Sequence, residues 1–261
     1  MTFLHSIILG IVEGITEFLP ISSTGHLIVT SRLLGLLDSE FMKSFEIFIQ
    51  LGAILAVVVF YRRTIFDLKK INVWKKVLAA FIPTGILGLI LYKLVKQYLL
   101  GNVTAVILSL IIGGVILIVF EMWQSRKGEE KYHEIEDVPY LSAITIGVAQ
   151  IIAVIPGVSR SGTTIVAGRL LKLSKKTIVD FSFLLSIPVM VAASGLDLFK
   201  SRATLFSDSH ELSLLAVGFI VSFIVALGVI KWLLSYVQKH SFIAFGVYRI
   251  LAGLLFFFLF F

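Results

Sequence analysis

The chain alternates between long apolar stretches and two shorter segments that carry most of its polar motifs. Five apolar stretches approach the roughly 20 residues that a membrane-spanning helix needs, and they cover 77–95, 103–122, 178–199, 212–234 and 242–261. A sixth stretch, 45–61, is shorter and contains Glu46 and Gln50. Lipid does not tolerate such side chains, so they point toward protein or water. The pattern predicts an all-α integral membrane protein with six transmembrane helices.

Two segments, 1–37 and 141–172, interrupt this pattern with glycine, proline and clustered hydroxyl side chains. Non-helical backbone at membrane depth is tolerated only where protein or a water-filled cavity satisfies it. We therefore expect each segment to form a re-entrant helix pair, and we expect the two pairs to meet inside the bundle.

The two polar segments also resemble each other at one constant spacing. Glu13 aligns with Gln150, and the run 22–25 aligns with 159–162. Each half then holds one polar segment followed by three spans. An odd number of crossings inverts the second half, as in many transporters. We expect one membrane domain with halves 1–122 and 141–261, joined by a cytoplasmic loop at 123–140.

Composition and charge agree with a membrane protein and exclude several other classes. The chain is 58% hydrophobic and 15% charged, with a mean hydropathy of +1.01 and no cysteine, which removes disulfides and thiolate chemistry. The net charge of +7 does not indicate nucleic-acid binding, because the basic residues lie in short loops. Loops 62–76, 123–140, 169–177 and 231–241 carry fifteen Lys and Arg residues and the opposite loops six, so the first set is expected to be cytoplasmic.

The first motif, EGITEFLPISSTGH at 13–26, combines acids, hydroxyls and a histidine. Glu13 and Glu17 share a helix face, where a divalent cation would offset their repulsion; the alternative is a pair of solvated interfacial carboxylates. Pro20 ends the helix, and the hydroxyls after it suit an anion. His26 is a candidate proton carrier, or else a hydrogen-bonded core histidine within a capping turn.

The second motif, PGVSRSGTT at 156–164, places Arg160 among glycine and serine residues within an apolar segment. A guanidinium fork matches phosphate oxygens, and free backbone N–H groups at a helix start favour the same anion. The alternative is a structural ion pair of Arg160 with Glu13 or Glu17. Together the two motifs supply the parts of a phosphoryl-transfer site.

Three further polar residues lie within apolar spans. Glu46 and Gln50 share a helix face, where they support either the cation and its carboxylates or a structural hydrogen bond. Arg249, in the last span, pairs with a carboxylate, attracts a lipid phosphate or extends to the interface. We favour the ion pair.

The two motifs closely resemble those of the undecaprenyl-diphosphate phosphatase family, also called the bacitracin-resistance proteins, and the similarity extends over nearly the whole chain. The resemblance implies hydrolysis of undecaprenyl diphosphate to undecaprenyl phosphate and inorganic phosphate at the outer face of the bacterial plasma membrane. This reaction recycles the lipid carrier of peptidoglycan and envelope polysaccharide synthesis. The resemblance also implies a divalent cation, Mg or Ca, as cofactor.

Carried onto this chain, the resemblance gives Glu13 and Glu17 as the acidic, metal-binding motif and Arg160 as the phosphate clamp. Ser23 is our preferred nucleophile, while His26 or a metal-activated water are the alternatives. Glu17, Ser23, His26 and Arg160 are thus the candidate catalytic residues. The residues expected to bind the phosphate are Ser22, Thr24, Gly25, Gly157, Ser159, Ser161, Gly162 and Thr164.

Two other classes of protein compete with a phosphatase. A secondary transporter or lipid flippase also uses inverted repeats and broken helices. An intramembrane serine protease would use Ser23 and His26 but leaves Arg160 unexplained. The expected partners are a polyprenyl diphosphate lipid and the bilayer, and the sequence leaves open whether the chain forms a homodimer.

Overall fold

The computed structural model describes residues 1–261 except 37–38, 99–101, 128 and 206–208. Within the described residues the chain is helical and contains no β-strand. Six helices in this described part are long and apolar enough to cross a membrane, which confirms the predicted class and number of spans. They cover Phe41–Phe60, Leu68–Leu91, Val103–Ser125, Lys175–Gly195, Ser209–Lys239 and Ile243–Phe260.

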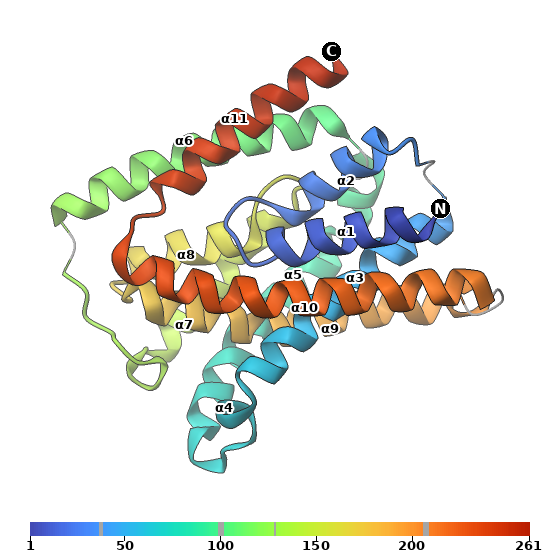
Figure 1. The fold of residues 1–261 in the computed structure, drawn as a ribbon. Coiled ribbons are helices and arrows are strands. Elements are labelled where there is room, and N and C mark those ends of the chain that lie inside the picture. The colour runs from blue at the N-terminus through green and yellow to red at the C-terminus, as the bar shows by residue number, and fades with distance from the viewer. Residues whose placement is uncertain (37–38, 99–101, 128, 206–208) are drawn as a thin grey trace.

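The helices follow the same order in both halves of the chain (Figure 1). A pair of short helices comes first and three long helices follow. The first half contains α1 (Phe3–Thr16), α2 (Ser23–Leu33), α3 (Glu40–Phe60), α4 (Arg62–Phe66), η1 (Leu68–Lys70), α5 (Ile71–Tyr98) and α6 (Val103–Lys127). After η2 (Ile135–Asp137), the second half contains α7 (Tyr140–Ala149), η3 (Gln150–Val154), α8 (Arg160–Leu170), α9 (Lys175–Leu205), α10 (Ser209–Lys239) and α11 (Ile243–Phe260).

The packing of the two halves is reciprocal. The first short helix of each half lies against the second long helix of the other, so α1 packs on α10 and α7 packs on α5, while α3 packs on α9 and α6 on α11. Figure 1 shows the first and last of these pairs, α1 beside α10 and α6 beside α11. This exchange suits the predicted repeat; the inverted orientation of the halves and the turning back of α1–α2 and α7–α8 within the membrane stay predictions.

Small residues let the helices of these pairs approach closely. A Cβ added at Gly14 of α1 would lie 2.8 Å from the carbonyl oxygen of Ser222 on α10. At the α6–α11 crossing, a Cβ at Gly114 would lie 2.7 Å from the carbonyl oxygen of Gly246. Glycine at these positions therefore sets the helix spacing, as is common between membrane helices.

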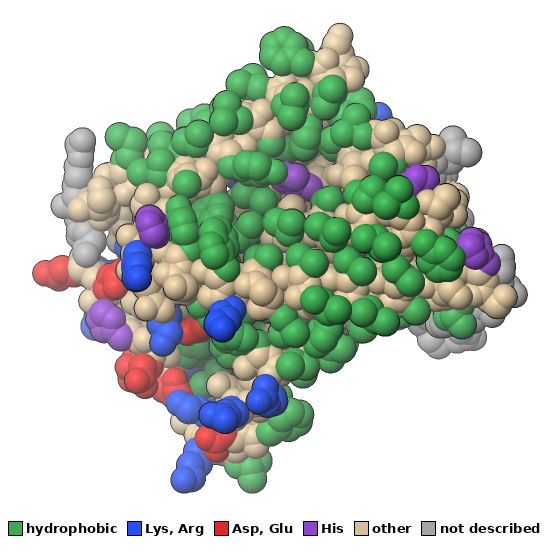
Figure 2. All heavy atoms as spheres, in the orientation of Figure 1, with side chains coloured by type: hydrophobic (Ala, Val, Ile, Leu, Met, Phe, Trp, Pro, Cys, Tyr) green, Lys and Arg blue, Asp and Glu red, His purple; other side chains and the backbone are tan. Residues whose placement is uncertain are grey.

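The surface separates an apolar belt from a charged end. In Figure 2, hydrophobic side chains cover the broad face formed by α1 and α10, and charged side chains gather over α4 and beside α7. Two segments expected as loops, 62–76 and 231–241, are largely helical, because α4, η1 and the start of α5 occupy the first and α10 extends to Lys239. Long basic side chains reach water from a helix end, so charge alone does not mark a loop.

Candidate active site

Each motif forms the turn between two short helices, and a serine hydroxyl caps the helix that follows. Ser22 has a φ of 72° and accepts a hydrogen bond from the N–H of Gly25 at 3.4 Å, which begins α2. Ser159 accepts from the N–H of Gly162 at 3.1 Å, which begins α8. Gly157 has a φ of 90°, a conformation that favours glycine. Both turns therefore bend the chain sharply just before a capped helix.

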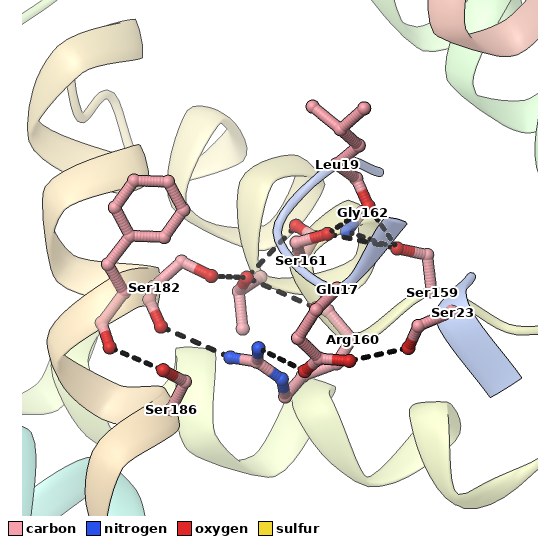
Figure 3. A network of polar contacts seen from close by, with 11 residues as sticks. Glu17, Leu19, Ser23, Ser159, Arg160, Ser161, Gly162, Ser182 and Ser186 are labelled. Carbon is pink, nitrogen blue, oxygen red and sulfur yellow. Dashed lines mark hydrogen bonds and ion pairs between the residues drawn. The ribbon is translucent and has the colours of Figure 1, made fainter. Parts of the chain in front are cut away.

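The two turns meet, as expected, around Glu17 (Figure 3). Ser23 Oγ donates a hydrogen bond to Glu17 Oε2 at 2.5 Å, and Arg160 Nη2 donates to Glu17 Oε1 at 2.9 Å. Arg160 Nη1 also donates to the carbonyl oxygen of Ser182 at 3.3 Å. The side chains of Arg160 and Glu17 are 14% and 5% exposed, so the ion pair lies largely out of water. One carboxylate thus connects a hydroxyl from the first half to a guanidinium from the second.

A cavity of about 170 Å³ opens beside this ion pair. It brings together both motifs, the side chain of Gln50 from α3 and an apolar wall. The lining residues are Glu17, Ser22, Ser23, Thr24, Gln50, Ala153, Val158, Ser159, Arg160 and Met190. The predicted phosphate-binding residues Ser22, Thr24 and Ser159 therefore lie at the cavity.

The other predicted phosphate-binding residues pack behind the turns. Ser161 Oγ donates to the carbonyl oxygen of Leu19 at 2.8 Å, and the Thr164 hydroxyl is hydrogen bonded to that of Ser182 at 2.7 Å. The three glycines of this group allow close packing. A Cβ atom added at Gly25 or Gly157 would contact Val106, and one added at Gly162 would contact Ser159, at distances of 2.7–3.2 Å. In this structure these residues hold the two turns together.

Glu13 lies one helical turn before Glu17 and is fully buried. Within the described part of the chain, both of its carboxylate oxygens lack a hydrogen-bond partner. The charges of Glu17 and Glu46 repel its charged form, and that of Arg160 attracts it. Glu46 in turn accepts a hydrogen bond from Ser31 Oγ at 3.0 Å. An unpartnered buried carboxylate beside other carboxylates is costly unless a cation or proton balances it. The donors present therefore fit a bound divalent cation.

His26 is not among the residues that line the cavity, and it contacts the last helix. Its Nδ1 lies 2.7 Å from the carbonyl oxygen of Ser22, and its Nε2 lies 2.8 Å from the hydroxyl of Tyr248. A carbonyl can only accept, so Nδ1 carries the proton and a neutral ring accepts from Tyr248. Burial lowers the pKa of His26 below its usual value, which favours this neutral form.

Two residues on α11 contact the site in ways that the sequence did not predict. Tyr248 holds His26 although 222 positions separate them. Arg249 is buried and donates to four main-chain carbonyls: those of Pro20, Gly157, Ser109 and Leu110, at 2.9–3.3 Å. The predicted ion pair of Arg249 with a carboxylate was wrong, because its guanidinium N–H groups donate to carbonyl oxygens instead. A tyrosine and an arginine side by side in an apolar span were the available signal.

The site defines a class of protein before any comparison. A hydroxyl held by a carboxylate, next to a largely buried guanidinium at a cavity in a helical membrane protein, has the parts of a phosphoryl-transfer enzyme. The family described as "Bacitracin resistance protein BacA" matches residues 6–255. The chain belongs to this family.

Curated relatives match the whole length of the chain. A protein named undecaprenyl-diphosphatase from Aquifex aeolicus (strain VF5) is 51% identical over 265 residues, covering 100% of both chains. A protein of the same name from Sulfurihydrogenibium sp. (strain YO3AOP1) is 50% identical, with 98% of this chain and 99% of the relative covered. Another from Methanococcus aeolicus is 45% identical, with 98% and 97% covered.

Proposed function

We propose that this protein is an undecaprenyl-diphosphate phosphatase, a membrane enzyme that releases inorganic phosphate and leaves undecaprenyl phosphate. The observation that carries the proposal is the contact of Ser23, Glu17 and Arg160 at one cavity. The family membership and the names of the relatives support the same reaction. The product would serve again as the lipid carrier of peptidoglycan and envelope polysaccharide synthesis.

In this mechanism Ser23 is the nucleophile and Glu17 is its general base. Ser23 Oγ already donates to Glu17 Oε2, so the proton passes to the carboxylate as Oγ attacks the terminal phosphorus. The bond from phosphorus to the bridging oxygen breaks, and undecaprenyl phosphate leaves. Glu17 passes that proton to the departing undecaprenyl phosphate and becomes a carboxylate again. Water then attacks the phosphoserine, Glu17 accepts its proton, and this proton passes to Ser23 Oγ as inorganic phosphate departs.

Arg160 holds the phosphoryl oxygens in this scheme. Its guanidinium is anchored by Glu17 and by the carbonyl of Ser182 and lines the cavity. Charge that develops on the phosphoryl oxygens is stabilised most strongly by donors that are already oriented and shielded from water. Both ring nitrogens of His26 are engaged, which favours Ser23 over His26 as nucleophile.

A divalent cation would be held by Glu13 and Glu17, with Glu46 and Gln50 supporting the carboxylates. Glu13 supports this assignment because both of its buried oxygens are unpartnered. The described residues contain no cluster of three or more His, Cys, Asp and Glu ligands. Mg²⁺ suits such a site better than Ca²⁺, because it commonly takes one or two carboxylates and completes its shell with water and phosphate oxygens. When bound, the ion would neutralise diphosphate charge.

The enzyme is multi-pass, and we place it in the plasma membrane with the active site toward the outer face. The lysine and arginine side chains at the charged end in Figure 2 support a cytoplasmic location for the loops that carry them. The lipid flippase remains the rival from another class. It predicts lipid movement without phosphate release, and it gives no role to a serine hydroxyl held against a carboxylate.

Phosphate release from undecaprenyl diphosphate by the purified protein tests the proposal. Ser23→Ala should abolish release, because the attacking oxygen is lost. Ser213→Ala is the matched control, since Ser213 is exposed and its hydroxyl donates only within α10, to the carbonyl of Ser209. Lipid movement by reconstituted protein that releases no phosphate would support the flippase instead.

A further inference from the structure

A second polar cavity lies away from the candidate active site, at the end of the molecule that carries the basic loops. Its volume is about 250 Å³. It lies where α6 and α8 end and where α9 and α11 begin. The lining residues are Glu121, Met122, Gln124, Ser125, Arg169, Lys175, Ser241 and Ile243. None of them belongs to either motif.

Two buried polar atoms of these lining residues have no hydrogen-bond partner among the residues that the structure describes. They are Glu121 Oε2, which can only accept while the carboxylate is ionised, and Arg169 Nε, which can only donate. Both residues are about 5% exposed or less. A buried polar atom without a hydrogen bond costs free energy. A ligand that offers one donor to Glu121 and one acceptor to Arg169 would satisfy both groups.

The charges around the cavity are balanced before any ligand binds. Lys175 Nζ lies 3.4 Å from Glu121 Oε1, and Arg169 Nη1 lies 2.5 Å from Glu130 Oε1. The first ion pair is longer than the 2.7–2.9 Å of a direct charged hydrogen bond, and Lys175 Nζ also donates to the carbonyl oxygen of His240 at 3.1 Å. An ammonium has three N–H donors, so Lys175 keeps one for a ligand. A ligand with a net charge would leave one charge unpaired. A zwitterion keeps every charge paired.

The size and surroundings of the cavity suit a lipid headgroup. A single water takes up about 30 Å³, far less than this volume. Along α6, Ile112, Ile116, Val119 and Met122 are all at least half exposed. Their spacing of three or four residues places them on one face, and Met122 reaches the cavity. This face offers an acyl chain a path that ends at the polar lining.

We propose that this cavity binds a zwitterionic phospholipid through a phosphoethanolamine headgroup. The primary ammonium donates to Glu121, and the phosphate accepts from Lys175 and Arg169. The headgroup then sits between the two members of the long ion pair, and its acyl chains lie along α6. Such a lipid links α6, α9 and α11 at the basic end and stabilises the bundle without taking part in catalysis.

The test compares headgroups on the full-length protein, purified in detergent and stripped of lipid. Phosphatidylethanolamine, phosphatidylcholine and phosphatidylglycerol with identical acyl chains are added, and thermal unfolding and native mass spectrometry report binding. We expect phosphatidylethanolamine to bind about tenfold more tightly than the other two, the scale of one hydrogen bond to a charged group. Phosphatidylcholine has an ammonium that cannot donate, and phosphatidylglycerol has none.

The variant Glu121→Gln should remove this preference. Glu136→Gln is the matched control, because Glu136 pairs with Lys70 at the same end but outside the cavity, and it should retain the preference. Equal binding of the three lipids, tighter binding of phosphatidylglycerol, or an unchanged preference in Glu121→Gln would overturn the proposal. The wild-type headgroup series decides the question even where Glu121→Gln does not fold.

Discussion

Replacing Arg160 with lysine separates the geometry of the guanidinium from its charge. Arg160 uses two nitrogens at once, Nη2 toward Glu17 at 2.9 Å and Nη1 toward the carbonyl of Ser182 at 3.3 Å. These anchors fix the plane in which its remaining N–H groups face the cavity. A lysine ammonium keeps the positive charge but cannot reproduce this planar fork.

The expected loss follows from the contacts that lysine cannot make. One or two hydrogen bonds to charged phosphoryl oxygens, at about 1.5–3 kcal/mol each, correspond to roughly 3 kcal/mol of transition-state stabilisation. At 1.36 kcal/mol for each factor of ten, Arg160→Lys should lower kcat/KM by about 100-fold. Arg160→Ala is less informative, because it leaves the buried Glu17 carboxylate without its cationic partner and lowers the free energy of unfolding by about 3–5 kcal/mol.

The assay is phosphate release from undecaprenyl diphosphate at several substrate concentrations, with thermal unfolding measured on the same samples. Arg62→Lys is the matched control, since Arg62 is exposed and donates to the carbonyl of Val59. Turnover of Arg160→Lys within about threefold of wild type, at equal stability, would refute the clamp.

Three further outcomes are expected. Chelation should abolish phosphate release and Mg²⁺ should restore it, because Glu13 is buried with two unpartnered oxygens; full activity in chelator would contradict the cation site. Burial lowers the pKa of His26 in the folded protein. In the unfolded chain the imidazole has its usual pKa of about 6.5, so below that pH the unfolded chain binds a proton more readily than the folded one. Stability should therefore fall as pH drops from 7 to 5, and fall less in His26→Gln; identical slopes in thermal unfolding would count against this. Arg249→Lys should lower the free energy of unfolding by roughly 2–4 kcal/mol, because it leaves main-chain carbonyls without donors, and an unchanged unfolding temperature would argue otherwise.

The spans and the convergence of the two motifs were predictable because each has a strong local signal. Apolar length fixes the spans. A carboxylate pair and an arginine at membrane depth must find polar partners, so an ion pair of Arg160 with Glu13 or Glu17 was foreseeable. The structure shows that the partner is Glu17. The division of the hydroxyls was not predictable, since Ser23 and Ser161 look alike in sequence. One donates to Glu17 and the other to the carbonyl of Leu19.

The contacts that α11 makes with the two turns could not be predicted from the sequence for a related reason. Arg249 bonds to main-chain carbonyls, and every residue type carries the same carbonyl, so no pattern points to Pro20 or Gly157. His26 and Tyr248 meet across 222 positions. A spacing argument works within one helix, where neighbours lie three or four residues apart. It does not extend to helices that pack only after the bundle has closed.

The dependence of both turns on Arg249 has a consequence for biosynthesis. Residues 13–26 and 156–164 are translated well before the final helix, so a nascent chain can insert its motifs while Pro20 and Gly157 still lack the donor that ties them together. The protein then becomes catalytically active only after its last membrane-spanning helix has been inserted. A ribosome that stalls before residue 249 would leave a membrane-inserted but inactive protein.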